Sequence, residues 1–320
     1  MNNPWDDVAP PKFDINVRRA SPDHPYDFFW GKGVDGKLLF VFQMNAGSSL
    51  PSQLPEIQGV ELSAFHSDKK HLVLSLKEKT DWEMFLSLCR DLLQATCMLK
   101  SEESVVPVIL RRLARWQQFL SRGSNGLLSE AEIKGLIGEV LFMENSLTPV
   151  FGIEDAVRFW QGPEGYPQDF NVGDMAIEVK CQSGGSSPNI RISSLEQLNS
   201  QLPEMYLYVL TLGKAATGDS NGIDLVSLVS RVREKIVCEA PNAIERFNDL
   251  LHACRYSDRE AYRDYSYIPV SEVMLNVRDG FPRINLDAVP SGVSKVTYSI
   301  SLDECMPYEG YPSWFRREGS

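Results

Sequence analysis

Three side chains within residues 169–180 have the types and spacing to bind a metal ion and act on a phosphate ester. Asp169, Glu178 and Lys180 lie in the segment DFNVGDMAIEVK. Mg²⁺ prefers one or two protein carboxylates, completed by water and phosphate oxygens. A nearby lysine can hold a phosphate, or orient and help deprotonate an attacking water. The pattern therefore indicates metal-dependent hydrolysis of a phosphodiester.

A tight hairpin is expected to bring these side chains onto one face of a sheet. The dipeptide Gly-Asp at 173–174 suits a two-residue turn, and apolar residues alternate on both sides of it. Pairing outward from this turn sets Asp169 opposite Glu178, with Cβ atoms on the order of 5 Å apart. Lys180 joins the same face through the two-residue repeat of a strand.

The expected pair of carboxylates creates an electrostatic conflict. Directly opposed carboxylates repel each other, so the pair is unfavourable unless a cation or a proton lies between them. A divalent metal ion would remove the conflict. The alternative interpretation is a solvent-facing strand on which Lys180 only neutralises Glu178, and spacing alone leaves both interpretations open.

A helix with a clear start is expected upstream of the hairpin, over residues 129–145. Ser129 followed by Glu132 forms a capping box, and apolar residues at helical spacing cover one face. Glu139 lies inside this apolar stripe. A charged residue at such a position either extends to the boundary of the buried face or has a functional role.

The hydrophobic pattern divides the chain into two domains, 1–103 and 104–320. Residues 1–25 are rich in proline and are expected to form an irregular lead-in. Strands are predicted at 37–43, 60–65 and 71–76, followed by a helix at 81–99. The first domain is therefore expected to be a small β-rich unit closed by a helix, and no motif indicates its role.

The second domain is expected to alternate helices and strands around the hairpin. Helices are predicted at 105–121, 223–237 and 240–254, and strands at 205–212, 270–277 and 293–302. We therefore expect an α/β protein in which a mixed sheet flanked by helices follows an N-terminal β-rich domain.

The charge distribution favours one local basic region over a surface that coats nucleic acid. The formal net charge is −11, whereas phosphate binding draws on local lysine and arginine. A run without acidic residues contains the weaker candidates for nucleic-acid contact, which are Arg111, Arg112, Arg115 and Arg122. A solvated helix face is the alternative interpretation of this run.

Composition argues against several other classes of protein. No apolar run approaches the length of a membrane helix, and the N-terminus lacks the pattern of a signal peptide, so we expect a cytoplasmic protein without a membrane partner. The six cysteines are dispersed and form no CxxC pair. This spacing indicates neither a zinc site nor a disulfide framework.

At the hairpin the sequence resembles the PD-(D/E)XK phosphodiesterase superfamily, which includes many restriction endonucleases and repair nucleases. Asp169 matches the lone aspartate of that motif, and Glu178-Val179-Lys180 matches its E-x-K. Gln168 stands where the motif's name has proline, a position that varies across the superfamily. Helix, hairpin and following strand come in the order of the same core, and this agreement counts for more than the motif alone.

The resemblance implies a restriction-endonuclease-like core and a set of metal ligands. Asp169, Glu178 and the carbonyl of Val179 would bind Mg²⁺, with Mn²⁺ as a substitute. Glu139 would add a carboxylate from the leading helix.

The resemblance also implies an activity and partners. The chain looks like bacterial members of the superfamily that are associated with restriction or phage defence. The implied reaction is hydrolysis of DNA, with Lys180 positioning the attacking water and Gln197 assisting the site. DNA and other defence proteins would be its partners, and cutting both strands with one site per chain favours a homodimer.

Two other hypotheses stay open at this point. The fold could serve binding or scaffolding in a defence complex with little or no cutting, which the acidic net charge favours. Metal affinity without turnover would distinguish that case. The same site could also act on RNA or on a nucleotide, which competition between substrates would distinguish.

Overall fold

The computed structural model divides into two compact units, which are described separately. The residues described are 3–12, 15–44, 50–51, 54–66, 69–97, 99–121, 127–185, 188–216, 219–293 and 295–315. The first unit comprises Met1–Leu127 and Arg255–Glu260, and the second comprises Leu128–Cys254 and Ala261–Ser320. The sequence-based division fell at 103/104, whereas the units of the structure divide at Leu127.

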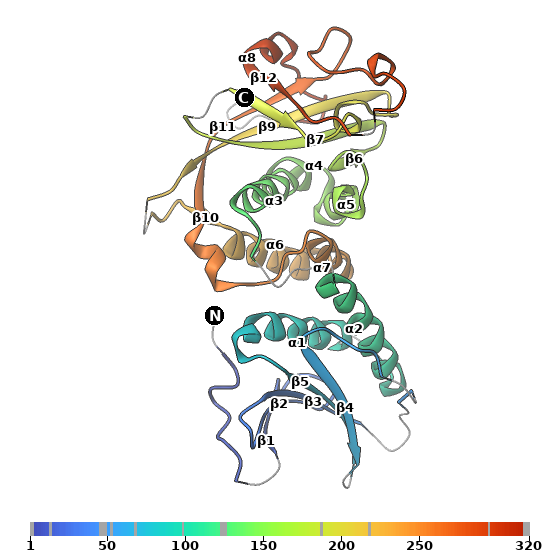
Figure 1. The fold of residues 1–320 in the computed structure, drawn as a ribbon, viewed down its shortest axis with the longest axis vertical. Coiled ribbons are helices and arrows are strands. Elements are labelled where there is room, and N and C mark those ends of the chain that lie inside the picture. The colour runs from blue at the N-terminus through green and yellow to red at the C-terminus, as the bar shows by residue number, and fades with distance from the viewer. Residues whose placement is uncertain are drawn as a thin grey trace. The chain divides into compact units, whose positions relative to one another are not determined.

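The first unit is a five-stranded antiparallel sheet covered by two helices (Figure 1). Its strands, in the spatial order β1-β2-β3-β5-β4, are β1 (Ile15–Arg19), β2 (Phe28–Gly33), β3 (Leu38–Met44), β4 (Val60–His66) and β5 (Lys70–Leu76). The three strands predicted from alternating apolar segments are thus confirmed as β3, β4 and β5.

The helices of the first unit are α1 (Trp82–Cys97) and α2 (Val105–Ser121), both close to their predicted ranges. They pack on each other and on the sheet, around a core that includes Trp5, Phe85 and Trp116. Because α2 joins this core, it belongs to the first unit.

The expected irregular lead-in over residues 1–25 is wrong in part. Residues Ile15–Arg19 form β1, which pairs antiparallel with β2, and Trp5 is fully buried and donates its Nε1 hydrogen to the carbonyl of Leu39 at 2.8 Å. β1 is an edge strand with four of its five residues exposed. The strand is short, and the prolines on both sides of it masked the alternation of Ile15 and Val17 with Asn16 and Arg18.

The second unit is built on a five-stranded sheet in the order β10-β11-β9-β7-β6. These strands are β6 (Phe170–Val172), β7 (Met175–Ser183), β9 (Glu204–Lys214), β10 (Ile223–Asp224) and β11 (Ser266–Asn276). β7 and β9 are parallel, and the other neighbours are antiparallel, so the sheet is mixed as expected.

The predicted hairpin register is confirmed for three residue pairs. Val172 lies opposite Met175, Asn171 opposite Ala176 and Phe170 opposite Ile177. Gly173 has φ of 60°, a left-handed conformation that glycine adopts without the steric cost of a Cβ atom. The side chains at even-numbered positions of β7 therefore share one face of the sheet.

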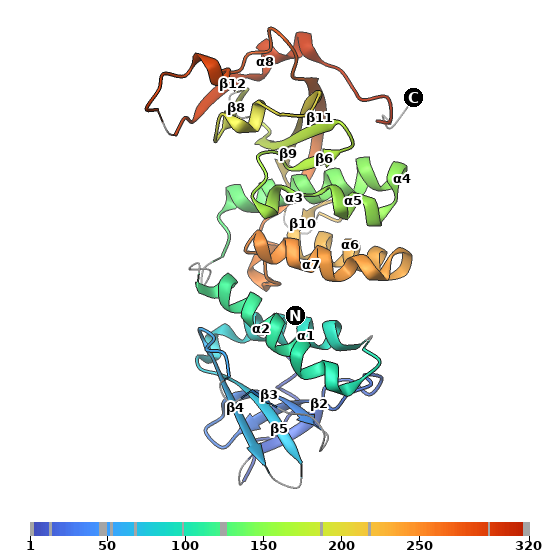
Figure 2. The ribbon, with the colours of Figure 1, turned by 90° about the vertical axis from the view of Figure 1, so that its right-hand side faces the viewer.

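One face of this sheet is covered by helices in two layers. Figures 1 and 2 show α3 (Glu130–Phe142), α4 (Thr148–Phe151) and α5 (Ile153–Phe159) beside the sheet, with α6 (Leu225–Glu239) and α7 (Ile244–Ala253) beyond them. The predicted capping box at Ser129 and Glu132 is present, and a π-helical turn, Met143–Leu147, follows α3. Phe142 anchors α3 to the sheet through ring contacts with Phe170 and Tyr208.

The other face carries a small two-stranded ribbon and the short helix that follows it. β8 (Asn189–Ile192) pairs antiparallel with β12 (Tyr298–Ser301), and α8 (Leu302–Cys305) follows. Ile190 and Ile192 pack with Ala176 and Val209 in one apolar cluster. Among the residues described, no helix is both long and apolar enough to cross a membrane.

α3 approaches β7 closely at a single glycine. A Cβ atom placed on Gly138 would lie 2.1 Å from Sγ of Cys181, and 3.5 Å from Cγ1 of Val179. No pair of such atoms can come as near as 2.1 Å, so this helix position requires glycine. The close approach sets how near the helix that bears Glu139 lies to the strand that bears Glu178.

We predict that Gly138→Ala lowers the free energy of unfolding by about 1–3 kcal/mol, as overpacking of a buried contact does. In a Cys181→Ala background the same substitution should cost much less, because the new methyl would then meet only Cγ1 of Val179 at 3.5 Å and Cβ of residue 181 at 3.9 Å, which are ordinary contacts. Urea unfolding of the four variants measures the coupling.

Gly135→Ala is the matched control on the same helix, since a Cβ atom there has no neighbour within 4 Å. It should be neutral or stabilising by up to about 1 kcal/mol through helix propensity. The packing described would be contradicted if Gly138→Ala lowered the free energy of unfolding equally in the wild-type and the Cys181→Ala backgrounds.

Candidate active site

Glu178 is the most deeply buried acidic group of the hairpin. It lies on β7 with 1% of its side chain exposed. Its Oε1 is 2.7 Å from Nζ of Lys180, and Oε2 is buried without a hydrogen-bond partner. A buried oxygen that lacks a donor is costly, because burial removes its water.

Asp169 lies just beyond the paired part of the hairpin, which ends at Phe170 and Ile177. Its carboxylate, rather than its backbone, bonds to β7, since Oδ2 accepts the Val179 amide hydrogen at 2.8 Å. Its carbonyl accepts from the amides of Gln161 and Gly162 at 2.9 and 3.0 Å. Asp169 and Glu178 therefore do not form the predicted backbone pair. Instead, the side chain of Asp169 contacts the backbone of Val179, the residue after Glu178.

Glu139 comes from α3 and reaches this group from the helix-covered face. Its Oε2 accepts a hydrogen bond from Nε1 of the fully buried Trp160 at 2.7 Å. Trp160 precedes the loop that leads to Asp169, and its backbone forms an isolated bridge with Phe170. One indole thus connects the helix and the hairpin.

Lys180 is held between Glu178 and the amide of Gln197. The Oε1 atom of Gln197 accepts from Nζ of Lys180 at 3.1 Å and from the backbone amide of Ser193 at 2.8 Å. Gln197 lies in a single 3₁₀ turn, Glu196–Leu198, instead of a longer helix. Gln168, the residue at the proline position of the motif, donates from Nε2 to the carbonyl of Glu196 at 2.5 Å and so ties this turn to the hairpin.

The carboxyl groups of Glu139, Asp169 and Glu178 all have raised pKa values. Burial, and then the charge of Asp169, raises the pKa of Glu139 to about 8. Burial raises the pKa of Asp169 to about 6, against the opposing effect of the Val179 amide. Burial and the charge of Asp169 hold the pKa of Glu178 well above its usual range. Raised values of this kind are typical of functional sites.

Lys180 keeps its proton in this setting. Burial lowers the pKa of its ammonium group, but the carboxylates of Glu178, Asp169 and Glu139 outweigh burial and raise it above the usual value. A lysine that is charged at neutral pH acts as a hydrogen-bond donor and a positive charge, and it does not accept a proton from water.

A family model described as "Putative PD-(D/E)XK family member" (DUF4420) matches residues 1–303 of the chain. The chain belongs to this family. The resemblance inferred from Asp169, Glu178 and Lys180 is thereby confirmed. No curated protein and no solved structure matches the chain.

PD-(D/E)XK proteins commonly use divalent metal ions, and the donor chemistry here fits a hard cation. In the part of the chain that the structure describes, no three acidic, histidine or cysteine side chains converge as they stand on one metal position. Mg²⁺ needs only one or two carboxylates, because water and substrate complete its shell. The partnerless Oε2 of Glu178 and the carboxylate of Asp169 meet that need, and Glu139 stands near as a third group.

The backbone of Val179 enters the site through its amide, which donates to Asp169. That the carbonyl of Val179 binds a metal ion stays a prediction.

The four arginines named from the sequence belong to the first unit, whereas this cluster belongs to the second. Arg111 is exposed. Arg112 is 2% exposed and faces Asp91, with 3.8 Å between Nη1 and Oδ1. A guanidinium buried in this way does not suit a phosphate contact. The side chain of Arg115 and all of Arg122 lie outside the residues described.

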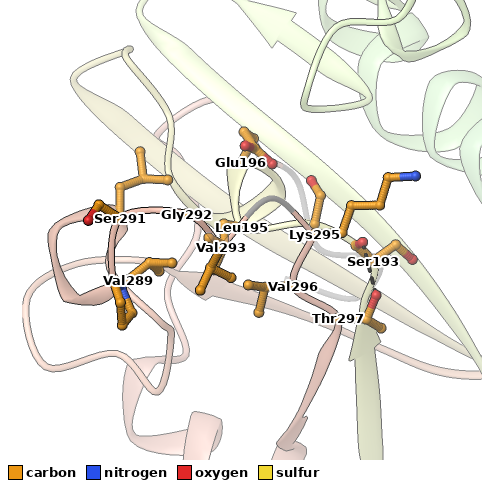
Figure 3. A pocket seen from close by; sticks show the side chains of 13 residues that line it. Ser193, Leu195, Glu196, Val289, Ser291, Gly292, Val293, Lys295, Val296 and Thr297 are labelled. Atoms are coloured by element: carbon orange, nitrogen blue, oxygen red, sulfur yellow. Dashed lines mark hydrogen bonds between the residues drawn. The ribbon is translucent and has the colours of Figure 1, made fainter.

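Two cavities adjoin the site. The larger, about 600 Å³, lies between the turn that begins at Ser193 and residues of 286–293 and 295–297. Figure 3 shows Glu196 and Lys295 along its wall and a hydrogen bond from Thr297 to Ser193. The smaller, about 260 Å³, is lined by Lys180 itself.

Sequence reasoning did not identify Trp160 or Gly162 as parts of this site. A Cβ atom on Gly162 would lie 2.8 Å from Oδ1 of Asp169, so the loop can reach the aspartate only with glycine there. The glycines in the loop sequence QGPEGYP could have pointed to this contact. However, glycine in a loop more commonly indicates a turn than a close approach to a side chain.

We predict that the metal-free protein loses stability as pH rises from about 5 to about 8. Glu139 has a pKa of about 8 in the folded protein and about 4.5 as an ordinary glutamate. Between these values the folded state binds more protons than the unfolded state, so raising the pH favours unfolding. Glu139→Gln should remove part of this dependence, because glutamine keeps an acceptor for Trp160 and has no proton to lose.

Thermal unfolding in the presence of a chelator, from pH 5 to pH 8, measures this effect. The stabilisation by Glu139→Gln relative to wild type should grow with pH over that range. Glu154→Gln, at an exposed glutamate of α5, is the control and should show no such trend. A Glu139→Gln difference that stays constant with pH would contradict the raised pKa.

Proposed function

We propose that this protein is a Mg²⁺-dependent endonuclease that hydrolyses phosphodiester bonds in DNA, in restriction or phage defence. The observation that carries the proposal is the buried Glu178, whose Oε2 lacks a partner while Oε1 is paired with Lys180. Family membership supports a restriction-endonuclease-like core for the second unit.

In this proposal Asp169 and Glu178 hold the metal ion, and Glu139 supports it. A bound Mg²⁺ would supply Lewis-acid stabilisation of the phosphoryl oxygens and a more acidic water. Trp160 fixes the orientation of Glu139, and the Val179 amide fixes Asp169. The ligands are thus held by groups that do not themselves contact the substrate.

Lys180 provides the fixed positive charge of the reaction. Water attacks the phosphorus and gives up a proton to solvent, a new P–O bond forms, and the ester P–O bond on the opposite side breaks as the leaving oxygen takes up a proton from solvent. Negative charge on the phosphoryl oxygens grows during this step, and the ammonium of Lys180 can donate hydrogen bonds to it. Gln197 holds Nζ in position through its amide oxygen, at 3.1 Å.

The expected effect of Lys180→Ala is a loss of DNA cleavage by at least about 10²-fold, the size seen when one donor to a developing oxyanion is removed. Cleavage of supercoiled and linear DNA in Mg²⁺ or Mn²⁺, followed on gels, measures it, with RNA digested in parallel. Lys235→Ala on α6, at a partly exposed lysine that pairs with Glu239, is the matched control and should cut like wild type. Equal cutting by Lys180→Ala and wild type would refute the assignment of Lys180.

A second candidate function is binding of DNA or of defence proteins by a nuclease fold that cuts little by itself. Two observations favour it: no three-ligand cluster is preformed among the described residues, and the net charge is −11. Mg²⁺ binding through Asp169 and Glu178, without cleavage of DNA or RNA, would support this candidate over the endonuclease.

A further inference from the structure

The smaller cavity beside Lys180 has the character of an anion site. It measures about 260 Å³, and its wall includes Lys180, Gln182 and Ser183 of β7 and Asn189 and Arg191 of β8. No acidic side chain lines it. Lys180 is paired with Glu178 at 2.7 Å, so Arg191 is the cation of this wall that has no acidic partner among the residues described.

Arg191 lies in the wall of this cavity and is an exposed residue of β8. Ile190 and Ile192 are buried in the apolar cluster under the sheet, so Asn189 and Arg191 face outward. β8 is held by its pairing with β12, in which Arg191 lies opposite Ser299. Among the residues described, the side chain of Arg191 forms no ion pair or hydrogen bond, so its guanidinium group is available to a ligand.

Ser183 offers a second donor at the same cavity. Its Oγ already accepts a hydrogen bond from Nζ of Lys134 at 2.8 Å. A hydroxyl group has one hydrogen to donate in addition to its acceptor positions. With an ammonium group on its acceptor side, the O–H of Ser183 is left to donate to an acceptor.

The larger cavity does not share this character. Glu196 and Lys295 both line it, and their opposite charges select no anion (Figure 3).

We infer that the cavity between β7 and β8 binds the backbone phosphate of the DNA strand next to the scissile phosphate, with Arg191 as its principal contact. The inference rests on the proposed function, which places the scissile phosphate at Lys180. Arginine pairs with phosphate oxygens through two parallel N–H donors, and Ser183 adds a third donor. Contacts of this kind fix the register of the strand and do not read its sequence.

The test is a DNA-binding titration of the full chain by fluorescence anisotropy, with Ca²⁺ in place of Mg²⁺ and a labelled duplex, at several salt concentrations. Arg191→Ala should weaken binding about tenfold, the size of a lost charged hydrogen bond. It should also reduce the slope of log K against log salt by about 0.9, the value for one phosphate contact. Arg191→Lys should keep that slope.

Arg158→Ala is the matched control, since Arg158 is an exposed arginine on α5 of the same unit, with 69% of its side chain accessible. It should bind like wild type. Unchanged thermal unfolding of both variants shows that neither has lost its fold.

The outcomes separate this inference from the proposed function. Cleavage in Mg²⁺ with no effect of Arg191→Ala on affinity or salt slope would overturn the inference and leave the endonuclease intact. Binding that depends on Arg191, with no cleavage by wild type, would overturn the endonuclease and, with it, the position next to a scissile phosphate, and would leave only a contact between Arg191 and a backbone phosphate. Absence of any DNA binding by wild type would overturn both.

Discussion

The pairing of buried Glu178 with Lys180 on β7 is the interaction on which the rest of this site depends. A carboxylate that is 1% exposed loses its hydration, and one ammonium group at 2.7 Å satisfies only one of its oxygens. Asp169 and Glu139 stand close enough to raise its pKa further, because three ionised carboxyl groups would carry more negative charge than a single lysine balances. Such an arrangement is unfavourable for stability alone and becomes favourable when a cation binds.

The elements around β7 hold this unfavourable cluster in place. β7 is bonded on one side to β6 and on the other, in parallel, to β9, which fixes the face on which Glu178 and Lys180 lie. α3 comes near through Gly138, and the indole of Trp160 ties its glutamate to the hairpin. Because a different element orients each carboxyl group, the fold holds the three groups close together despite their mutual repulsion.

Local sequence patterns predicted the parts of the site that depend on neighbouring residues. The glycine turn and the apolar alternation gave the register from Phe170 to Ile177, and the capping box gave the start of α3. The contacts made by distant segments were not predictable in this way. Asp169 leaves the expected ladder because the loop at Gln161 and Gly162 takes its carbonyl, and Gln197 reaches Lys180 from a single turn that has no periodic signal. Edge strand β1 was missed because it is only five residues long and lies in a proline-rich segment.

The central claim is that the three carboxyl groups form a site for a divalent cation, and calorimetry of Mg²⁺ binding tests it most directly. Titrations near pH 7, in two buffers of different ionisation enthalpy, report both the affinity and the protons released. The account predicts that wild type binds Mg²⁺ and releases protons, because carboxyl groups with raised pKa values must ionise to act as ligands, and that Glu178→Gln abolishes binding. Absence of binding by wild type, or binding that releases no protons and persists in Glu178→Gln, would contradict it.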